Sequence, residues 1–195
     1  VIVNEELAWG DPGFATAAYA TSLACAPVIT GATHEQKDKY LRMVAEEGAL
    51  ASYAVTEPGA GSDVAACKTS AVKDGDEYVI NGSKMWITGA GYADWFFVLA
   101  KTDLDAGYNG MSGFIVESNT PGLTLGKKEN NMGQRCSDTR SISFDDMRIP
   151  AENLVGGSES GGWMNAMKAF DMSRPNIAAH ATCLLYTSPS PRDVP

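Results

Sequence analysis

The feature that most constrains the fold is a change of period near Gly48. Residues 1–48 carry helical signals, with an Ala- and Leu-rich stretch over 15–26 that Pro27 is expected to end. Thr33 opens a capping-box sequence, which predicts the start of a further helix. After Gly48 the apolar residues come in short runs separated by Gly, Pro and Asn, a pattern typical of strands and turns.

About seven short strands are predicted after this point, and their spacing favours an antiparallel sandwich or barrel. The dipeptides Asp74-Gly75 and Asn81-Gly82 indicate tight turns between strands. The expected strand segments lie at residues 49–56, near 72, and at 78–80, 85–87, 95–100, 114–116, 123–125 and 142–144.

A glycine-rich stretch over 156–162 leads into a last helix. Trp163 and Phe170 share one helical face with Arg174, and Pro175 is expected to kink or interrupt the helix. Helices, then strands, then a helix predict an α+β chain with segregated layers rather than alternating βαβ units.

Composition narrows the expected partners. The 195 residues contain 15 Lys and Arg against 24 Asp and Glu, a formal net charge of −9. Because no basic stripe is present, we expect no nucleic-acid partner. No run of about 18 apolar residues is found, so we expect no membrane span. The four cysteines stand apart and there are only two histidines, which predicts free thiols of a reducing compartment and no metal site.

Three segments could carry chemistry. TEPGAGSD (Thr56–Asp63) could hold an anion with backbone N–H groups and a serine hydroxyl, or be a structural turn. MWIT (Met85–Thr88) could form an apolar wall with one hydroxyl against a flat aromatic cofactor, or hold a core tryptophan. FDMSRP (Phe170–Pro175) could place Arg174 at a buried anion, or form a surface ion pair with Asp171.

No carboxylate stands out as a catalytic base. Glu57 lies in the glycine-rich turn, Glu117 at a strand end and Asp145-Asp146 in a turn, and we expect each of them to be solvated. Spacing alone therefore assigns no base.

Seven longer stretches, taken in order, carry a family resemblance. They are NEELAWG (Asn4–Gly10), YAVTEPGAGSD (Tyr53–Asp63), DGDEYVINGSKMWIT (Asp74–Thr88), WFFVLAKTD (Trp95–Asp103), GFIVE (Gly113–Glu117), NMGQRCSDTRSISFDDMRIP (Asn131–Pro150) and AFDMSRP (Ala169–Pro175). Together they resemble the acyl-CoA dehydrogenase family over residues 1–178, and NMGQRCSDTR most resembles the medium-chain members.

The resemblance implies a flavoenzyme that oxidises acyl-CoA thioesters, medium-chain ones in particular, to trans-2-enoyl-CoA in fatty-acid β-oxidation. FAD would lie against the β domain, with the Thr88 hydroxyl near the reactive nitrogen, where negative charge develops on reduction. The residues implied to face FAD are Tyr53, Val55, Thr56, Ser62, Trp86, Ile87 and Thr88, and those implied to contact the CoA ester are Ser62, Asp171 and Arg174.

The family's catalytic base is a glutamate. Most members carry it late in the C-terminal helical domain, and some carry it one residue before the arginine of AFDMSRP. Ser173 occupies that second position here and cannot serve as the base. We therefore expect the base to lie beyond residue 195, and this chain to be an incomplete enzyme that is inactive by itself.

The resemblance also divides the chain. The expected parts are the end of an N-terminal helical domain at 1–48, a middle β domain at 49–155, the first helix of a C-terminal helical domain at 156–182, and a tail at 183–195 that departs from the family and is disordered or artefactual.

Partners and location follow from the same resemblance. It implies electron-transferring flavoprotein as electron acceptor, a homotetramer for the full-length protein, and the mitochondrial matrix, with a bacterial cytoplasm as the alternative. Two other functions stay open: a truncated module that binds acyl-CoA or flavin without turnover, and an acyl-CoA oxidase, which returns electrons to oxygen. The sequence does not distinguish between these functions, and it does not determine the preferred acyl chain length.

Overall fold

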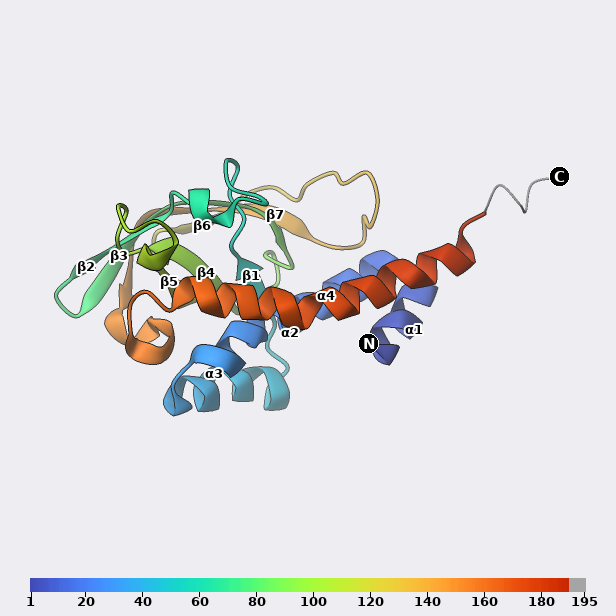
Figure 1. The fold of residues 1–195 in the computed structure, drawn as a ribbon, viewed down its shortest axis with the longest axis horizontal. Helices are drawn as coiled ribbons and strands as arrows, with labels where there is room; N and C mark the ends of the chain where they lie inside the picture. Colours follow the sequence, from blue (N-terminus) through green and yellow to red (C-terminus); the bar gives the residue numbers. More distant parts are fainter. Residues whose placement is uncertain (190–195) are drawn as a thin grey trace.

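The computed structural model describes residues 1–189 and, within that range, confirms the predicted order of helices, strands and a final helix. Figure 1 shows the strands gathered into one curled sheet, with α4 running along it. The helices are α1 (Ile2–Gly10), α2 (Pro12–Gly31), α3 (His34–Glu46) and α4 (Gly162–Thr187). The strands are β1 (Ala51–Ala54), β2 (Ser70–Asp74), β3 (Glu77–Thr88), β4 (Trp95–Lys101), β5 (Met111–Glu117), β6 (Leu123–Leu125) and β7 (Thr139–Pro150). Short 3-10 helices are η1 (Val64–Ala66), η2 (Gly107–Gly110), η3 (Ala151–Asn153) and η4 (Val155–Gly157).

The sheet is mixed rather than wholly antiparallel. Its strands lie in the order β1-β4-β2-β3-β7-β6, and β5 pairs with β4. Strand β4 runs parallel to β1, with Ala51 opposite Trp95, and parallel to β2 at Ser70 and Lys101. The other pairs are antiparallel, as predicted. Parallel neighbours need a long connection, and the β2–β3 hairpin supplies part of it between β1 and β4.

The two predicted turns have different outcomes. Gly75, with φ at +62°, lies in the predicted hairpin turn between β2 and β3. Gly82 does not turn the chain, because β3 continues through it and its pairing with β7 shifts register between Ile80 and Gly82. A Cβ atom at position 82 would lie 2.6 Å from Oγ1 of Thr69. Glycine at this position therefore permits a close approach between neighbouring segments rather than a reversal.

Two prolines lie inside helices instead of ending them. Helix α2 continues past Pro27 to Gly31, and α4 continues past Pro175. A proline removes one N–H donor from a helix; in α2 the residues around Pro27 are buried and their packing offsets this loss, whereas Pro175 is exposed on α4. Val28, directly after Pro27, is fully buried. The capping box at Thr33 is present as predicted.

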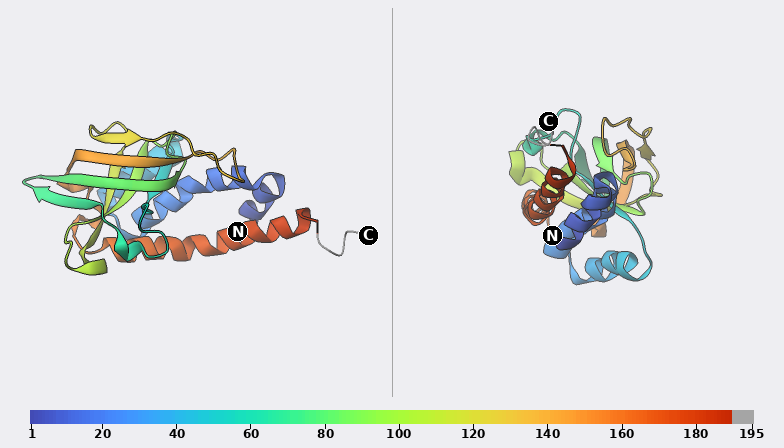
Figure 2. Two further views of the ribbon diagram at one scale, coloured as in Figure 1. Left: turned by 90° about the horizontal axis from the view of Figure 1, so that it is seen from above. Right: turned by 90° about the vertical axis from the view of Figure 1, so that its right-hand side faces the viewer.

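The last helix extends beyond the predicted boundary at residue 182. Helix α4 reaches Thr187, and Cys183 is buried in a small apolar cluster with Ala8 of α1. Figure 2 shows α1 and the C-terminal half of α4 lying beyond the edge of the sheet, where the two helices contact each other. The segment directly after residue 182 is thus helical, where the sequence predicted an irregular tail. Residues 190–195 of that tail lie outside the described residues.

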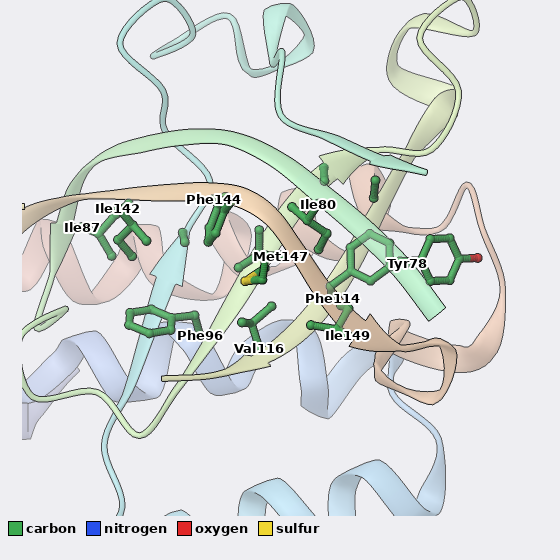
Figure 3. Packing of buried hydrophobic residues seen from close by; sticks show 14 of the residues in the cluster. Tyr78, Ile80, Ile87, Phe96, Phe114, Val116, Ile142, Phe144, Met147 and Ile149 are labelled. Carbon is green, nitrogen blue, oxygen red and sulfur yellow. The ribbon is translucent and has the colours of Figure 1, made fainter. Parts of the chain in front are cut away.

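Apolar side chains fill both faces of the sheet. Strand β4 alternates between them: Phe96 and Val98 point into the curl of the sheet, whereas Trp95, Phe97 and Leu99 point toward the helices. Figure 3 shows the first cluster, where side chains of β3 and β7 meet those of β4 and β5. The second cluster holds α2, α3 and α4 against the sheet.

Helix α2 corrects one expectation about composition. Its length and apolar character would suffice for a membrane crossing, although no such segment was predicted. In the structure, Ala24, Cys25 and Val28 of this helix pack in the cluster that contains Trp95. Burial against the sheet therefore accounts for part of the apolar composition of α2.

Candidate functional site

A cavity of about 270 Å³ lies where the ends of β1 and β3 face helices α2 and α4. It unites the first two predicted segments, because the backbone N–H of Met85 donates to the carbonyl of Thr56 at 2.9 Å and joins the loop after β1 to β3. The lining consists of Thr16, Tyr19, Ala20, Leu23, Tyr53, Thr56, Trp86, Ile87, Thr88, Phe170 and Ile177.

Trp86 reaches this cavity through a distortion of β3. Its φ is +62°, and the pairing of β3 with β7 shifts register between Lys84 and Ile87. A bulge of this kind redirects a side chain that regular alternation would place elsewhere. The indole is 54% exposed, whereas Ile87 beside it is buried. Trp86 is therefore not a core tryptophan, and its strained backbone lies at the candidate site.

Two hydroxyl groups on the cavity wall are available to a ligand. Thr56 and Thr88 are half-buried, and among residues 1–189 neither side-chain hydroxyl makes a hydrogen bond. The carbonyl of Thr88 is held separately, because the Ser52 hydroxyl donates to it at 2.7 Å. The cavity thus combines an apolar wall with hydrogen-bonding groups that the protein itself leaves unused, as small-molecule sites do.

Tyr53 fixes one side of the cavity. Its ring stacks on Phe97 at 5.4 Å between centroids and meets Phe170 edge-on at 5.5 Å. Its hydroxyl donates to the carbonyl of Ala166 at 3.2 Å, and burial raises the pKa of the phenol. Tyr53 therefore stays neutral and ties α4 to the sheet beside the cavity.

Several predicted site residues lie away from the lining. The side chain of Val55 is buried in the core, and Ser62 is exposed on the glycine-rich loop. Asp171 and Arg174 form an ion pair with each other on the surface of α4, with side chains 69% and 67% exposed. The surface pair weighed in the sequence analysis is therefore present. Ser173 is buried, and its hydroxyl donates to the carbonyl of Phe170 at 2.9 Å.

Helix α2 contributes lining residues that were not predicted from the sequence. Thr16, Tyr19, Ala20 and Leu23 line the cavity from this helix, at the spacing of one helical face. This helical spacing is the sequence pattern that could have identified them. Because α2 is largely apolar around its circumference, the pattern does not distinguish a ligand-facing stripe from a core stripe.

The expectation that Glu57 is solvated is wrong. Its side chain is 6% exposed and pairs with the fully buried Lys84 at 2.9 Å. Burial by itself would raise the pKa of Glu57, but the Lys84 charge and hydrogen bonds from Cys67 and Thr69 outweigh it and lower the pKa to about 2. Glu57 is therefore ionised inside the protein, beside the loop that carries Thr56.

The described part of the chain holds no cluster of metal-binding side chains. Within residues 1–189, no group of three or more His, Cys, Asp or Glu side chains is arranged to hold a metal ion. Cys25, Cys67 and Cys183 are buried free thiols, and Cys136 is exposed. Burial raises the pKa of Cys25 to about 11, so its thiol remains protonated.

Comparison with known proteins identifies the fold. The profile of the acyl-CoA dehydrogenase N-terminal domain matches residues 1–48, and that of the acyl-CoA dehydrogenase middle domain matches residues 52–147. The chain belongs to the acyl-CoA dehydrogenase family. Tyr53, Thr56 and Trp86–Thr88 of the cavity all come from the middle-domain match.

Individual relatives agree with this assignment. The chain is 53% identical over 189 residues to a probable medium-chain specific acyl-CoA dehydrogenase 2, mitochondrial, of Caenorhabditis briggsae, a match covering 95% of this chain and 46% of the relative. Butyryl-CoA dehydrogenase from Megasphaera elsdenii has a similar structure, with 42% identity, a TM-score of 0.88, and coverage of 92% and 47%.

A third protein is an acyl-CoA dehydrogenase complexed with FAD from Bacillus anthracis, with 35% identity, a TM-score of 0.86, and coverage of 93% of this chain and 31% of that one. The chain spans about half the length of the curated relatives it matches, or less.

Proposed function

We propose that the full-length protein carrying this chain is an FAD-dependent acyl-CoA dehydrogenase that converts acyl-CoA thioesters to trans-2-enoyl-CoA. The observation that carries this proposal is the cavity in which Tyr53 and Thr56 meet the bulged segment Trp86–Thr88. These segments come from different strands, and they are the family motifs implied to face the flavin. Their meeting at one cavity supports a shared ligand.

The residues of this cavity fit a flavin ring. Trp86, Ile87 and Phe170 offer a largely apolar surface for a flat aromatic system, and the Thr56 and Thr88 hydroxyls lack partners among the described residues. FAD, when bound, would supply the acceptor for the hydride that leaves the β-carbon of the acyl group. The Thr88 hydroxyl would donate a hydrogen bond to the ring where negative charge develops, and would so stabilise that charge.

The substrate side of the proposal rests on fewer residues. Ser62 and Arg174 are exposed, as is Asp171, and all three remain accessible to the CoA ester. Because exposed ion pairs hold together weakly, the Arg174 guanidinium can leave Asp171 for an anionic group of CoA. Because Ser173 stands where some family members carry the glutamate base, we assign proton abstraction from the α-carbon to a glutamate outside residues 1–195.

Finer aspects of the function are proposed from the family. The NMGQRCSDTR segment and the 53% identical medium-chain relative support a medium-chain acyl substrate and a role in fatty-acid β-oxidation. The mitochondrial name of that relative supports the mitochondrial matrix, with a bacterial cytoplasm as the alternative. We further propose a homotetramer that passes electrons to electron-transferring flavoprotein.

The proposal is tested on the purified full-length protein. We expect flavin absorbance in the visible range, and we expect that absorbance to bleach under anaerobic conditions on addition of octanoyl-CoA, more completely than with butyryl-CoA. Protein without bound flavin, or flavin that octanoyl-CoA leaves oxidised, would contradict the proposal. Reduction of electron-transferring flavoprotein without release of hydrogen peroxide distinguishes a dehydrogenase from an oxidase.

A further inference from the structure

The buried pair Lys84–Glu57 joins the two segments that carry Thr56 and Trp86 of the cavity lining, and it has no role in the function proposed above. Lys84 is fully buried, and its ammonium donates to Oε1 of Glu57 at 2.9 Å and to the carbonyl of Val55 at 3.0 Å. It also lies 3.5 Å from the Cys67 sulfur. Each ammonium hydrogen thus has a partner, as a buried charge requires.

Glu57 is equally well held. Oε1 also accepts from the Thr69 hydroxyl at 2.6 Å, the Thr69 N–H at 3.0 Å and the Cys67 thiol at 2.9 Å, while Oε2 accepts from the Lys68 N–H at 2.7 Å. The carboxylate therefore ties the glycine-rich loop to the segment just before β2. The backbone of Glu57 and Ala60 exchanges two further hydrogen bonds that close the loop itself.

Both residues of this pair lie next to cavity-lining segments in the chain. Lys84 immediately precedes the bulge that turns Trp86 to its left-handed conformation, and Glu57 immediately follows Thr56. Consecutive residues of β3 bond consecutive carbonyls at the start of this loop: the Lys84 ammonium donates to the carbonyl of Val55 and the Met85 N–H donates to that of Thr56. The pair thus fixes the Thr56 wall against the wall made by Trp86.

A contribution to folding stability does not by itself explain why a buried ion pair is present at this position. The desolvation of two charges offsets most of their attraction, and well-packed apolar residues often replace a buried ion pair with no loss of stability. A directional bond network does something that apolar contacts cannot, because it sets the relative placement of two backbone segments to a fraction of an ångström.

We propose that Lys84 and Glu57 are positioning residues for the flavin, which hold the Thr56 loop and the Trp86–Thr88 bulge at the separation that the ring requires. This inference rests on the proposed function. It assigns no chemical step to either residue, because both are buried away from the cavity lining.

The test uses full-length protein and the double variant K84M/E57Q, which removes the ion pair without leaving a buried charge. We expect FAD to bind about tenfold more weakly or worse, because small displacements of positioning groups have effects of this size. We also expect the visible circular dichroism of the bound flavin to change, while the midpoint of thermal unfolding of the apoprotein moves no more than in F144L. Phe144 is buried in the curl of the sheet and does not line the cavity, so F144L reports general loss of core packing.

A second control is R148M, which removes an exposed pair with Asp74 and Glu77 at the other end of β3 and should leave FAD affinity within about twofold of wild type. Unchanged FAD affinity and dichroism in K84M/E57Q would overturn the inference while leaving the proposed function intact. Wild-type protein without flavin would instead overturn the proposed function. If the double variant does not fold, E57Q alone decides: it keeps Lys84 hydrogen-bonded, and wild-type FAD affinity in E57Q would refute the positioning role.

Discussion

Strand β3 departs from regular pairing with β7 at two places, between Ile80 and Gly82 and between Lys84 and Ile87. At the first, two residues of β7 oppose Asn81, and both Gly82 of β3 (φ +144°) and Asp146 of β7 (φ +43°) have positive φ; a Cβ at Gly82 would lie 2.6 Å from Thr69 Oγ1. At the second, the residue with positive φ is Trp86, at +62°, with its large side chain exposed at the cavity.

The two irregularities serve different ends. At the first, Gly82 has no side chain, so Thr69 can approach β3 closely and donate a hydrogen bond to Glu57. The second places a bulky residue in a conformation that costs roughly 1–3 kcal/mol, which surrounding structure must enforce. On β3, the glycine thus marks a place of close packing, whereas the strained tryptophan lies at the candidate site. The variants below test this distinction.

The largest effect is expected for Gly82→Ala. Its methyl group would overlap both the side chain and the Cα of Thr69, and its φ suits glycine alone. Overpacking and backbone strain together predict a loss of about 4 kcal/mol in the free energy of unfolding. Urea denaturation measures it. Gly75→Ala is the matched control, because a Cβ there meets open space, and it should cost only about 1 kcal/mol. Equal losses in the two variants would refute the close-approach account of Gly82.

A slightly smaller effect is expected from acid. The pKa of Glu57 is about 2 in the folded chain against an ordinary value of 4.5, so the unfolded state binds more protons between these two pH values. The stabilisation is therefore complete above pH 4.5 and is lost as pH falls through 2. Its size is about 3 kcal/mol. Urea unfolding of wild type and E57Q from pH 6 to pH 2.5 measures it, and the difference between the two proteins should stay constant down to about pH 4.5 and shrink below that pH. A constant difference would contradict the assignment.

The contrast also explains what the sequence could and could not predict. The capping box at Thr33 and the hairpin at Gly75 follow from local turn and cap chemistry, and both are present. Asn81-Gly82 carries the same local signal as a hairpin, yet long-range packing against Thr69 determines its conformation. Local patterns do not contain such contacts.

The candidate site divides in the same way. The family motifs indicated Tyr53, Thr56 and Trp86–Thr88 as site residues, and in the structure these residues line one cavity. The burial of Glu57 was missed because its partner Lys84 lies 27 positions away and the pairing exists only in the folded sheet. Thr16 and Tyr19 were missed because their helix is apolar on every side, so a ligand-facing stripe has no contrast.

Trp86→Gly is expected to separate binding from stability. Glycine adopts a φ of +62° without strain, so the free energy of unfolding should change by less than about 1 kcal/mol despite the loss of a large side chain. FAD affinity should fall about tenfold, or 1.4 kcal/mol, because the apolar wall loses its largest face. Flavin titration of the apoprotein, paired with urea denaturation, measures both. If stability falls by several kcal/mol while FAD binding is retained, Trp86 is a packing residue after all.

The smallest effect is expected for Arg148→Met, at the outer end of the same pair of strands. Arg148 donates to Asp74 and Glu77 at 3.0 Å, close to the Lys84–Glu57 distance of 2.9 Å, but its side chain is 52% exposed. The hydrogen bonds to Glu77 and Asp74 raise the pKa of Arg148 further, and the guanidinium is charged at every working pH in any case. Water solvates both partners when they separate, so the pair adds little to stability. We expect no resolvable change in the urea midpoint and no change in flavin binding. A clear loss in either measurement would show that distance, rather than burial, determines what an ion pair on this sheet contributes.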